Sequence, residues 1–76
     1  MKIILNAREI QWNSDRIAYS QIMDILGQKP DRIYSVTYHA KNAFDGKYDM
    51  DGSITPKESI SVIDGMIINA YDTSNS

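Results

Sequence analysis

The chain opens with two short segments in which apolar and polar positions alternate. Residues 2–6 are rich in isoleucine and leucine, and residues 9–12 place apolar side chains between polar ones. A period of two is typical of a strand with one buried face, so two such runs separated by residues 6–8 predict a β-hairpin. Ala7 stands where a tight turn with positive φ favours glycine, so the pattern predicts the hairpin but not its turn type.

The next segment changes to the period of a helix. Apolar residues recur at i, i+3, i+4 and i+7 from Tyr19 to Leu26, which places them on one face of an α-helix. The polar residues 13–15 precede this pattern and are expected to accept hydrogen bonds from the unpaired amides at the helix start. Gly27 is expected to end the helix in a left-handed conformation, and Pro30 prevents it from resuming.

The rest of the chain returns to a period of two. The expected elements are a strand over residues 32–39, a polar loop over 40–52, brief strands over 53–55 and 58–63, a turn at 64–65 and a last strand over 66–71. In the first of these strands Tyr34, Val36 and Tyr38 share one face, and the alternate residues through His39 share the other. Residues 72–76 are polar and are expected to be frayed.

This order of elements predicts an α+β fold of the β-grasp type, a mixed sheet of four to five strands crossed by one helix. The chain shows no internal repeat and no low-complexity tract, so we expect one domain over residues 1–72 and a flexible tail over 73–76. The sheet face expected to meet the helix carries Ile3, Leu5, Ile10, Trp12, Tyr34, Val36, Tyr38, Met66, Ile68 and Ala70.

Composition excludes several classes of protein. With 76 residues, 42% of them hydrophobic and 24% charged, the chain has the composition of an ordinary globular domain. Folding at this length buries roughly 62% of the unfolded surface, which is enough for one small core. The absence of cysteine rules out a disulfide framework. A net charge of −2 gives no attraction to nucleic acid or to an anionic membrane. The short apolar runs predict neither a membrane span nor a secretory signal, so we expect a cytoplasmic protein.

Residues 47–58 have part of the spacing of a calcium-binding loop. Asp49 and Asp51 stand at the third and fifth positions, and Glu58 stands at the twelfth. Lys47 occupies the first position, where its ammonium group would repel Ca²⁺, and the flanking segments lack a helical period. We therefore interpret the segment as a solvated acidic loop between strands and predict no metal and no other cofactor.

The sequence carries no catalytic constellation. His39 is its one histidine, it has no cysteine, and it contains neither a phosphate-binding glycine loop nor a nucleophile elbow. A core of this size also leaves little room for a substrate pocket. We predict that the protein is not an enzyme and has no catalytic residues.

The sheet face turned away from the helix is the main candidate for binding. Its expected residues are Ile4, Thr37, His39, Ile67, Asn69 and Tyr71. The first and last strands of a β-grasp sheet are neighbours, so Ile4, Ile67 and Tyr71 are expected to form one exposed apolar patch. Such a patch with a polar rim favours a protein partner, although scattered exposed apolar side chains are also normal on small proteins. The predicted partner-binding face is Ile4, His39, Ile67, Asn69 and Tyr71.

Four segments of the chain together resemble the bacterial multiubiquitin family. They are IAYSQIMDILG (residues 17–27), YSVTYHA (34–40), GSITPKESISV (52–62) and DGMIINAYDT (64–73). The domains of that family are ubiquitin-like β-grasp units found in bacterial operons. These operons also encode activating-enzyme-like, conjugating-enzyme-like and peptidase-like proteins. Here the unit occurs once rather than in tandem, and Ala7 departs from the glycine expected in the first turn.

The resemblance implies a protein modifier whose C-terminal carboxylate is activated and joined to an unknown protein target or to another copy. The conjugation tail it implies is Asp72, Thr73, Ser74, Asn75 and Ser76. This tail lacks the Gly-Gly ending that ubiquitin-like activation favours. Therefore Ser76 is activated directly, or a peptidase first trims the tail, or the chain is not conjugated. The missing glycines also disfavour a sulfur carrier. The kind of operon suggests a role in defence.

A non-covalent interaction module is the alternative from another class. Such a module would use the Ile4, Ile67 and Tyr71 face, or an open edge strand, to self-associate or to dock a partner. The tail separates the two hypotheses, because only a covalent modifier needs it.

Overall fold

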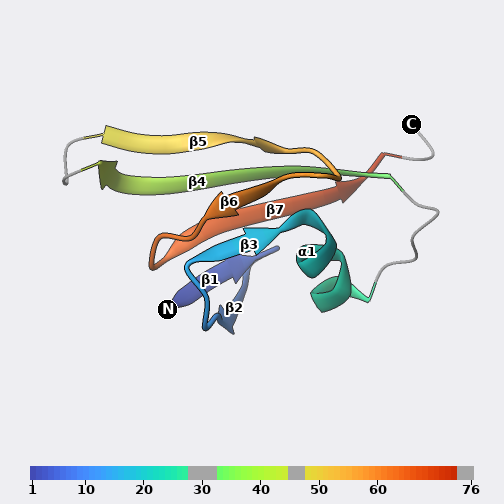
Figure 1. The fold of residues 1–76 in the computed structure, drawn as a ribbon, viewed down its shortest axis with the longest axis horizontal. Coiled ribbons are helices and arrows are strands. Elements are labelled where there is room, and N and C mark those ends of the chain that lie inside the picture. The colour runs from blue at the N-terminus through green and yellow to red at the C-terminus, as the bar shows by residue number, and fades with distance from the viewer. Residues whose placement is uncertain (28–32, 45–47, 74–76) are drawn as a thin grey trace.

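Two sheets and one helix make up the computed structural model, which describes residues 1–27, 33–44 and 48–73 (Figure 1). The elements are β1 (Lys2–Leu5), β2 (Arg8–Gln11), β3 (Arg16–Ala18), α1 (Tyr19–Leu26), β4 (Tyr34–Phe44), β5 (Tyr48–Ile54), β6 (Ser59–Ser61) and β7 (Met66–Asp72). The large sheet has the order β2-β1-β7-β4-β5, and β3 pairs with β6 in a separate two-stranded sheet. In the large sheet β1 and β7 run parallel, and its other pairs are antiparallel. This mixed sheet with one helix confirms the predicted α+β, ubiquitin-like β-grasp fold.

The first hairpin is confirmed, and the structure supplies its turn. Leu5 pairs with Arg8, so Asn6 and Ala7 alone form the turn. Their φ angles are 49° and 68°, and positive φ at both central residues is the pattern of a type I′ turn, which suits the twist of a hairpin. The Asn6 side chain also bonds to β7: its Nδ2 donates to the Ala70 carbonyl at 3.2 Å, and its Oδ1 accepts from the Ala70 amide at 2.8 Å. Asn6 therefore continues the pairing of β1 with β7 past the end of β1.

The core lies between the large sheet and the helix. Its buried hydrophobic side chains are Ile3, Leu5, Ile17, Tyr19, Ile22, Val36, Ala40, Ile54, Val62, Met66, Ile68 and Ala70. The other residues expected on the helix-facing side, Ile10, Trp12, Tyr34 and Tyr38, are partly buried against this cluster. No buried polar or charged side chain occurs among the described residues. Burial of apolar surface is therefore the main force that holds the sheet to the helix.

The helix ends as predicted but begins differently. Gly27 has a φ of 69° and closes the helix with its amide bonded to the Asp24 carbonyl, while Pro30 lies outside the described residues. The prediction that residues 13–15 cap the helix is wrong, because strand β3 intervenes and Ala18 is the N-cap. Alanine has no side-chain acceptor. The Gln21 side chain instead accepts a bond from the Ala18 amide at 2.8 Å.

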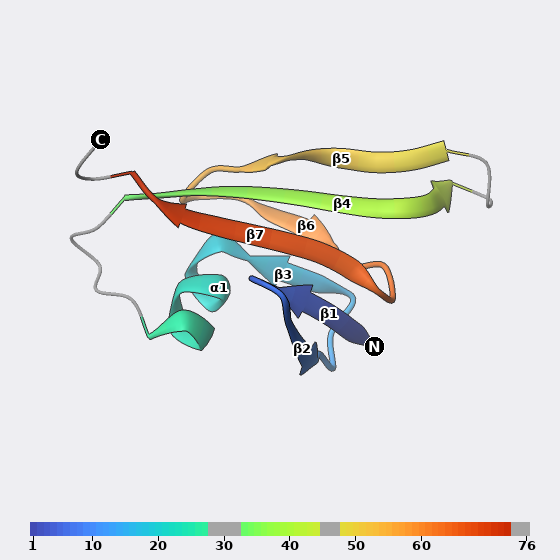
Figure 2. The same ribbon diagram turned by 180° about the vertical axis from the view of Figure 1, so that it is seen from behind.

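The predicted loop over residues 40–52 is also wrong. β4 continues through Phe44 and β5 begins at Tyr48, and the two strands pair antiparallel, while residues 45–47 of the expected loop lie outside the described residues. The paired strands β4 and β5 extend past the start of β7, at its Met66 end, in both views of the molecule (Figures 1 and 2). The expected strand over 53–55 is the end of β5, which stops at Ile54. Asp49 and Asp51 accordingly lie on an extended strand rather than in the compact loop that binds calcium.

The expected strand over residues 58–63 is shorter and lies outside the large sheet. Only Ser59–Ser61 is a strand, and it pairs with Arg16–Ala18. Arg16 joins the two strands through its guanidinium group, which donates to the Ser59 and Ser61 hydroxyls and to the Ser59 carbonyl. The turn at Asp64–Gly65 and the last strand are confirmed, with β7 running one residue further than expected. Within the described part of the chain, α1 is too short to cross a membrane.

Glu58 closes the turn between β5 and β6. The Thr55 amide donates to its Oε1 at 2.8 Å, and this bond, followed by one from the Thr55 side chain, holds the pKa of Glu58 below its ordinary value of 4.5. A carboxyl group whose pKa is lower in the folded state stabilises that state above the unfolded pKa and loses this contribution as the pH falls through the folded pKa. We therefore expect the contribution of Glu58 to be complete above about pH 4.5 and to disappear at lower pH.

This expectation is measured by urea unfolding of the wild type and of Glu58→Gln at about pH 6 and about pH 3. The wild type should lose more stability on acidification than the variant. Equal losses in the two proteins would show that Glu58 makes no such contribution.

Candidate functional site

The face of the large sheet that is turned away from α1 is called the uncovered sheet face below. Strand register brings four of its side chains into one row. Ile4 on β1 pairs with Ile67 on β7, and Ile67 pairs with His39 on β4. His39 in turn pairs with Asp51 on β5. Three of these four residues were predicted to lie on this face, whereas Asp51 was assigned to a loop. The row therefore runs from an apolar end on β1 and β7 to an acidic end on β5.

The predicted apolar patch is divided. Ile67 is 39% exposed and stands beside the partly buried Ile4, as the predicted order of the strands requires. Tyr71 is 58% exposed and lies four residues further along β7, which is roughly 13 Å at the rise of a strand. Asn69 is on the same face between Ile67 and Tyr71. The structure thus brings Ile4 and Ile67 together and leaves Tyr71 as a separate apolar position near the end of the strand.

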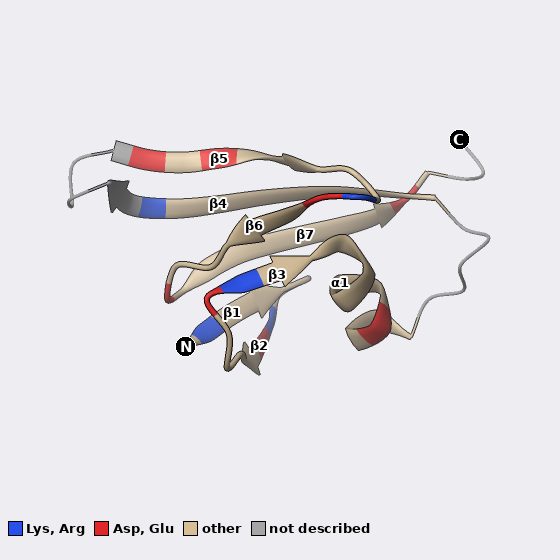
Figure 3. Cartoon of the chain, in the orientation of Figure 1, with Lys and Arg blue, Asp and Glu red and all other residues tan. Residues whose placement is uncertain are grey.

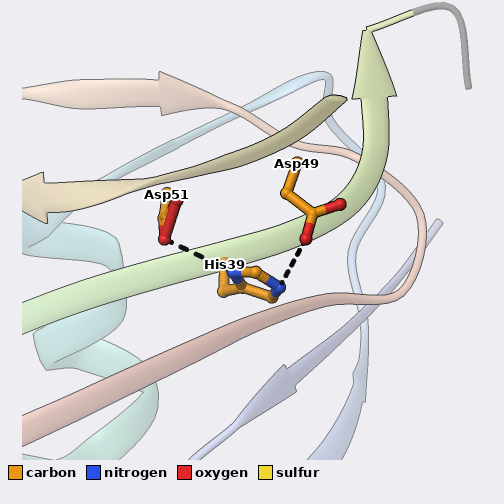
Figure 4. Close-up of polar contacts among 3 residues, drawn as sticks. All are labelled: His39, Asp49 and Asp51. Atoms are coloured by element: carbon orange, nitrogen blue, oxygen red, sulfur yellow. Dashed lines mark hydrogen bonds and ion pairs between the residues drawn. The ribbon is translucent and has the colours of Figure 1, made fainter. Parts of the chain in front are cut away.

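His39 lies between two carboxylates of β5 (Figure 4). Its Nε2 is 3.6 Å from Asp49 Oδ2, and its Nδ1 is 3.5 Å from Asp51 Oδ1. Both distances exceed the 2.7–3.2 Å of a good N–H···O hydrogen bond, so these are loose electrostatic contacts. Because the two carboxylates approach opposite nitrogens of one ring, they do not converge on a single point. No group of three possible ligands suited to a metal ion occurs in residues 1–27, 33–44 and 48–73.

An open cleft of about 460 Å³ lies beside His39 on this face. Its lining residues are Thr37, Tyr38, His39, Asp51, Gly52 and Asn69. Asp51 is the one carboxylate among them, and no lysine or arginine from the described part of the chain lines the cleft. Figure 3 shows the same imbalance along β5, where the two acidic positions stand out from the uncharged remainder of the described strand. The cleft is therefore suited to a group that donates hydrogen bonds or carries positive charge.

The end of β7 is tied to the start of β4. Asp72 pairs with Tyr34, and Thr73 donates to the Ile33 carbonyl twice, from its amide at 2.9 Å and from its Oγ1 at 3.1 Å. The expectation that the chain frays from Asp72 is therefore wrong for Asp72, which belongs to the sheet. Residues 74–76 of the predicted tail lie outside the described residues. The division into a domain over 1–72 and a tail over 73–76 stays a prediction.

A buried tyrosine from the helix supports this end of the sheet. Tyr19 is 7% exposed, and its hydroxyl both accepts a bond from the Tyr34 amide at 3.0 Å and donates to the Tyr34 carbonyl at 3.2 Å. One side chain of α1 thus satisfies both backbone groups of the residue that pairs with Asp72. The exposed Ile33 also lies at this point, at 64% exposure. Ile33 alternates onto the same strand face as His39 in the sequence, but it is not among the predicted site residues.

The sequence of the chain matches a known protein family. A family model described as multiubiquitin matches residues 1–74. The chain belongs to the multiubiquitin family. No curated protein and no solved structure matches it.

In this multiubiquitin domain the family match extends past β7. It includes Asp72, Thr73 and Ser74, the first three residues of the predicted tail. It also includes both the uncovered sheet face and the point where the chain leaves the sheet. The recognised family and the observed fold together establish a ubiquitin-like domain.

Proposed function

We propose that the chain is a bacterial ubiquitin-like protein modifier. In this role its C-terminal carboxylate is activated and then joined to a target protein or to another copy of the chain. Family membership over residues 1–74 carries the proposal. The domain is then the substrate of activating-enzyme-like and conjugating-enzyme-like partners rather than an enzyme itself.

The geometry at the end of β7 supports this role. A carboxylate does not form an amide or ester until one of its oxygens has been converted into a better leaving group, so the tail must enter the active site of another protein. Thr73 is the last residue for which the structure describes hydrogen bonds to the folded domain, and both of these bonds go to the Ile33 carbonyl. A partner that acts on the tail therefore meets a rigid sheet end and the exposed Ile33 and Tyr71.

Residues 72–76 contain no glycine. The proposal includes both routes, direct activation of Ser76 and prior trimming by a peptidase. The candidate acceptors, if copies are joined to one another, are Lys2, Lys29, Lys41, Lys47, Lys57, Ser74 and Ser76. Among them Lys2 already contacts Glu9 at 3.2 Å.

The test is a denaturing blot of N-terminally tagged protein, expressed in its source cell with the neighbouring genes. A tag is tolerated at this end because the Met1 nitrogen, which donates to the Trp12 carbonyl at 2.8 Å, keeps an N–H after it becomes an amide. We expect discrete adducts of higher mass that vanish when the activating enzyme is inactivated. Peptide masses across residues 72–76 identify the residue that carries the bond. A single band at the free mass, with the enzymes shown to be active, would refute conjugation.

A pair of variants separates the modifier from the non-covalent module. Deletion of residues 73–76 should abolish adducts, whereas Ile67→Asp should reduce them only as far as the uncovered face contacts the enzymes. The deletion also removes the bonds of Thr73, so its folding is checked by thermal unfolding. The exposed Ile67 beside Ile4 keeps the module as a second candidate. If the domain is a non-covalent module, we expect Ile67→Asp to lose binding to its partner and the deletion of residues 73–76 to bind normally.

A further inference from the structure

The outer face of the small β3–β6 sheet carries an arginine and two serines. Arg16, Ser59 and Ser61 are all exposed. Ile17 is buried and Ile60 is partly buried on the opposite face. Arg16 pairs with Ser61 across the two strands, and its side chain extends further to reach Ser59. The period of two in the strands therefore gathers three polar side chains on one surface in contact with solvent.

The guanidinium group of Arg16 is bonded to neutral oxygens. Its Nε and Nη2 both donate to the Ser59 hydroxyl, at 3.2 and 3.1 Å. Nη2 also donates to the Ser59 carbonyl at 3.0 Å, and Nη1 donates to the Ser61 hydroxyl at 3.3 Å. The carboxylate of Glu58, which precedes Ser59, accepts from the Thr55 amide instead. Within the described chain, no carboxylate forms an ion pair with Arg16.

One edge of this guanidinium group is short of acceptors. The Nε and Nη2 hydrogens are parallel, and such an edge binds two oxygens of one carboxylate or phosphate at about 2.7–2.9 Å. Here both hydrogens converge on the single hydroxyl oxygen of Ser59, at distances near the upper limit of an ordinary N–H···O bond. A phosphoryl group on that oxygen adds three strong acceptors and a negative charge beside this edge.

We propose that Ser59 is a phosphorylation site and that Arg16 binds the resulting phosphoserine. A protein kinase transfers the group from a nucleoside triphosphate. The Ser59 oxygen attacks the γ-phosphorus, the bond from that phosphorus to the bridging oxygen breaks, and the nucleoside diphosphate leaves. The hydroxyl proton passes to a base of the kinase. Arg16 is exposed and is held by hydrogen bonds to neutral groups, so its side chain moves aside for the transfer and returns afterwards.

Phosphorylation fastens β3 to β6 and reverses the local charge. Ser59 pairs with Ala18, the N-cap of α1, so a charged bond between the phosphoserine and Arg16 also holds the start of the helix. A phosphoserine carries about −1.5 to −2 charges at pH 7, which outweighs the single positive charge of Arg16. The site lies outside both the uncovered sheet face and the tail, so the inference does not depend on the proposed function.

The first test asks whether Ser59 receives the phosphoryl group. The purified domain is incubated with a lysate of its source cell and a nucleoside triphosphate, and is then cut with trypsin, which cleaves after lysine and arginine. Neither residue follows Lys57, so residues 58–76 form one peptide whose fragment masses identify the modified serine. We expect the group on Ser59. Ser59→Ala should remove it, whereas the matched variant Ser61→Ala should retain it.

The second test asks whether Arg16 binds the phosphoserine. Phosphoserine is incorporated at position 59 during protein synthesis, and the melting temperature is compared with that of the unmodified chain. We expect a rise of roughly 4–8 °C. In the Arg16→Gln background, compared with its own unmodified form, the rise should vanish. Arg8→Gln removes the same charge from an exposed position on β2 and should leave the rise unchanged.

Several results would overturn the inference. A lysate that phosphorylates its own proteins but not Ser59 would exclude the modification site. An equal rise in melting temperature with and without Arg16 would show that the arginine does not bind the group. Saturable binding of inorganic phosphate by the unmodified domain, with resonance shifts centred on Arg16, would assign the guanidinium group to an anion from outside the chain.

Discussion

Replacing Asn6 with glycine is expected to lower the free energy of unfolding by about 1.5–3 kcal/mol. Glycine adopts the φ of 49° at this position without strain, but it removes the side chain that bonds to both the amide and the carbonyl of Ala70. These bonds are partly buried, so their backbone partners on β7 lose pairing that water replaces incompletely. Chemical denaturation of the wild type and the variant measures the difference.

Ala7, the other residue of the turn, provides a control in which glycine should change the free energy of unfolding in the opposite direction. Ala7 has a φ of 68°, and a left-handed conformation costs a residue with a Cβ about 1–2 kcal/mol. Ala7→Gly should therefore stabilise the protein by about 0.5–1 kcal/mol after the extra chain entropy of glycine is subtracted. If both glycine variants shifted stability in the same direction, the bonds of Asn6 to Ala70 would not be what distinguishes the two positions.

Tyr19→Phe is expected to destabilise the fold by about 1–3 kcal/mol, and so to lower the melting temperature by roughly 4–24 °C. The ring still fills its place in the core, but the Tyr34 amide and carbonyl lose the hydroxyl that bonds to both. Hydrogen exchange should also become faster at Asp72 and Thr73, because Tyr34 pairs with Asp72. Thermal unfolding and exchange rates measure the two effects.

Tyr71 supplies the matched control for this substitution. It is 58% exposed on the uncovered face, so Tyr71→Phe removes the same hydroxyl from a ring in contact with solvent. Its effect on stability should stay within about 0.5 kcal/mol. A loss as large as that of Tyr19→Phe would mean that the hydroxyl of Tyr19 has no special role in holding the end of the sheet.

These two predictions concern the place where the proposed tail leaves the body. Asn6 holds β7 at Ala70, and Tyr19 holds the strand that pairs with Asp72. A modifier needs its tail to emerge from a fixed point so that enzymes can recognise the body and the tail together. Loosening that point should therefore impair conjugation more than the loss of stability alone would predict.

Local patterns predicted most of the elements correctly. The hairpin, the helix with Gly27 at its end and the last strand follow from periods of two and 3.6 and from one glycine with positive φ. The pair β3–β6 was not predicted because three-residue strands are too short to show a period. Residues 40–52 were assigned to a loop because their polar character hid the alternation of Asp49, Met50 and Asp51 around a partly buried methionine.

The candidate site was predicted only in part, for a related reason. The neighbouring positions of Ile4 and Ile67 follow once β1 and β7 are known to lie side by side in a β-grasp sheet. The place of Asp51 depends on the register of the β4–β5 pair, which no local pattern revealed. His39 was therefore placed on the correct face without the two carboxylates that surround it.

The sequence by itself determined the fold class, the faces of the main strands and the kinship with the multiubiquitin family, because these depend on residue periodicity and on short segments in a fixed order. Only the tertiary structure decided that Asn6 bonds to Ala70, that Tyr19 supports the end of β7, and that an acidic cleft lies beside an apolar pair. Each of these features joins residues distant in sequence. Their contact depends on strand register and helix packing, which are set by how the whole core closes.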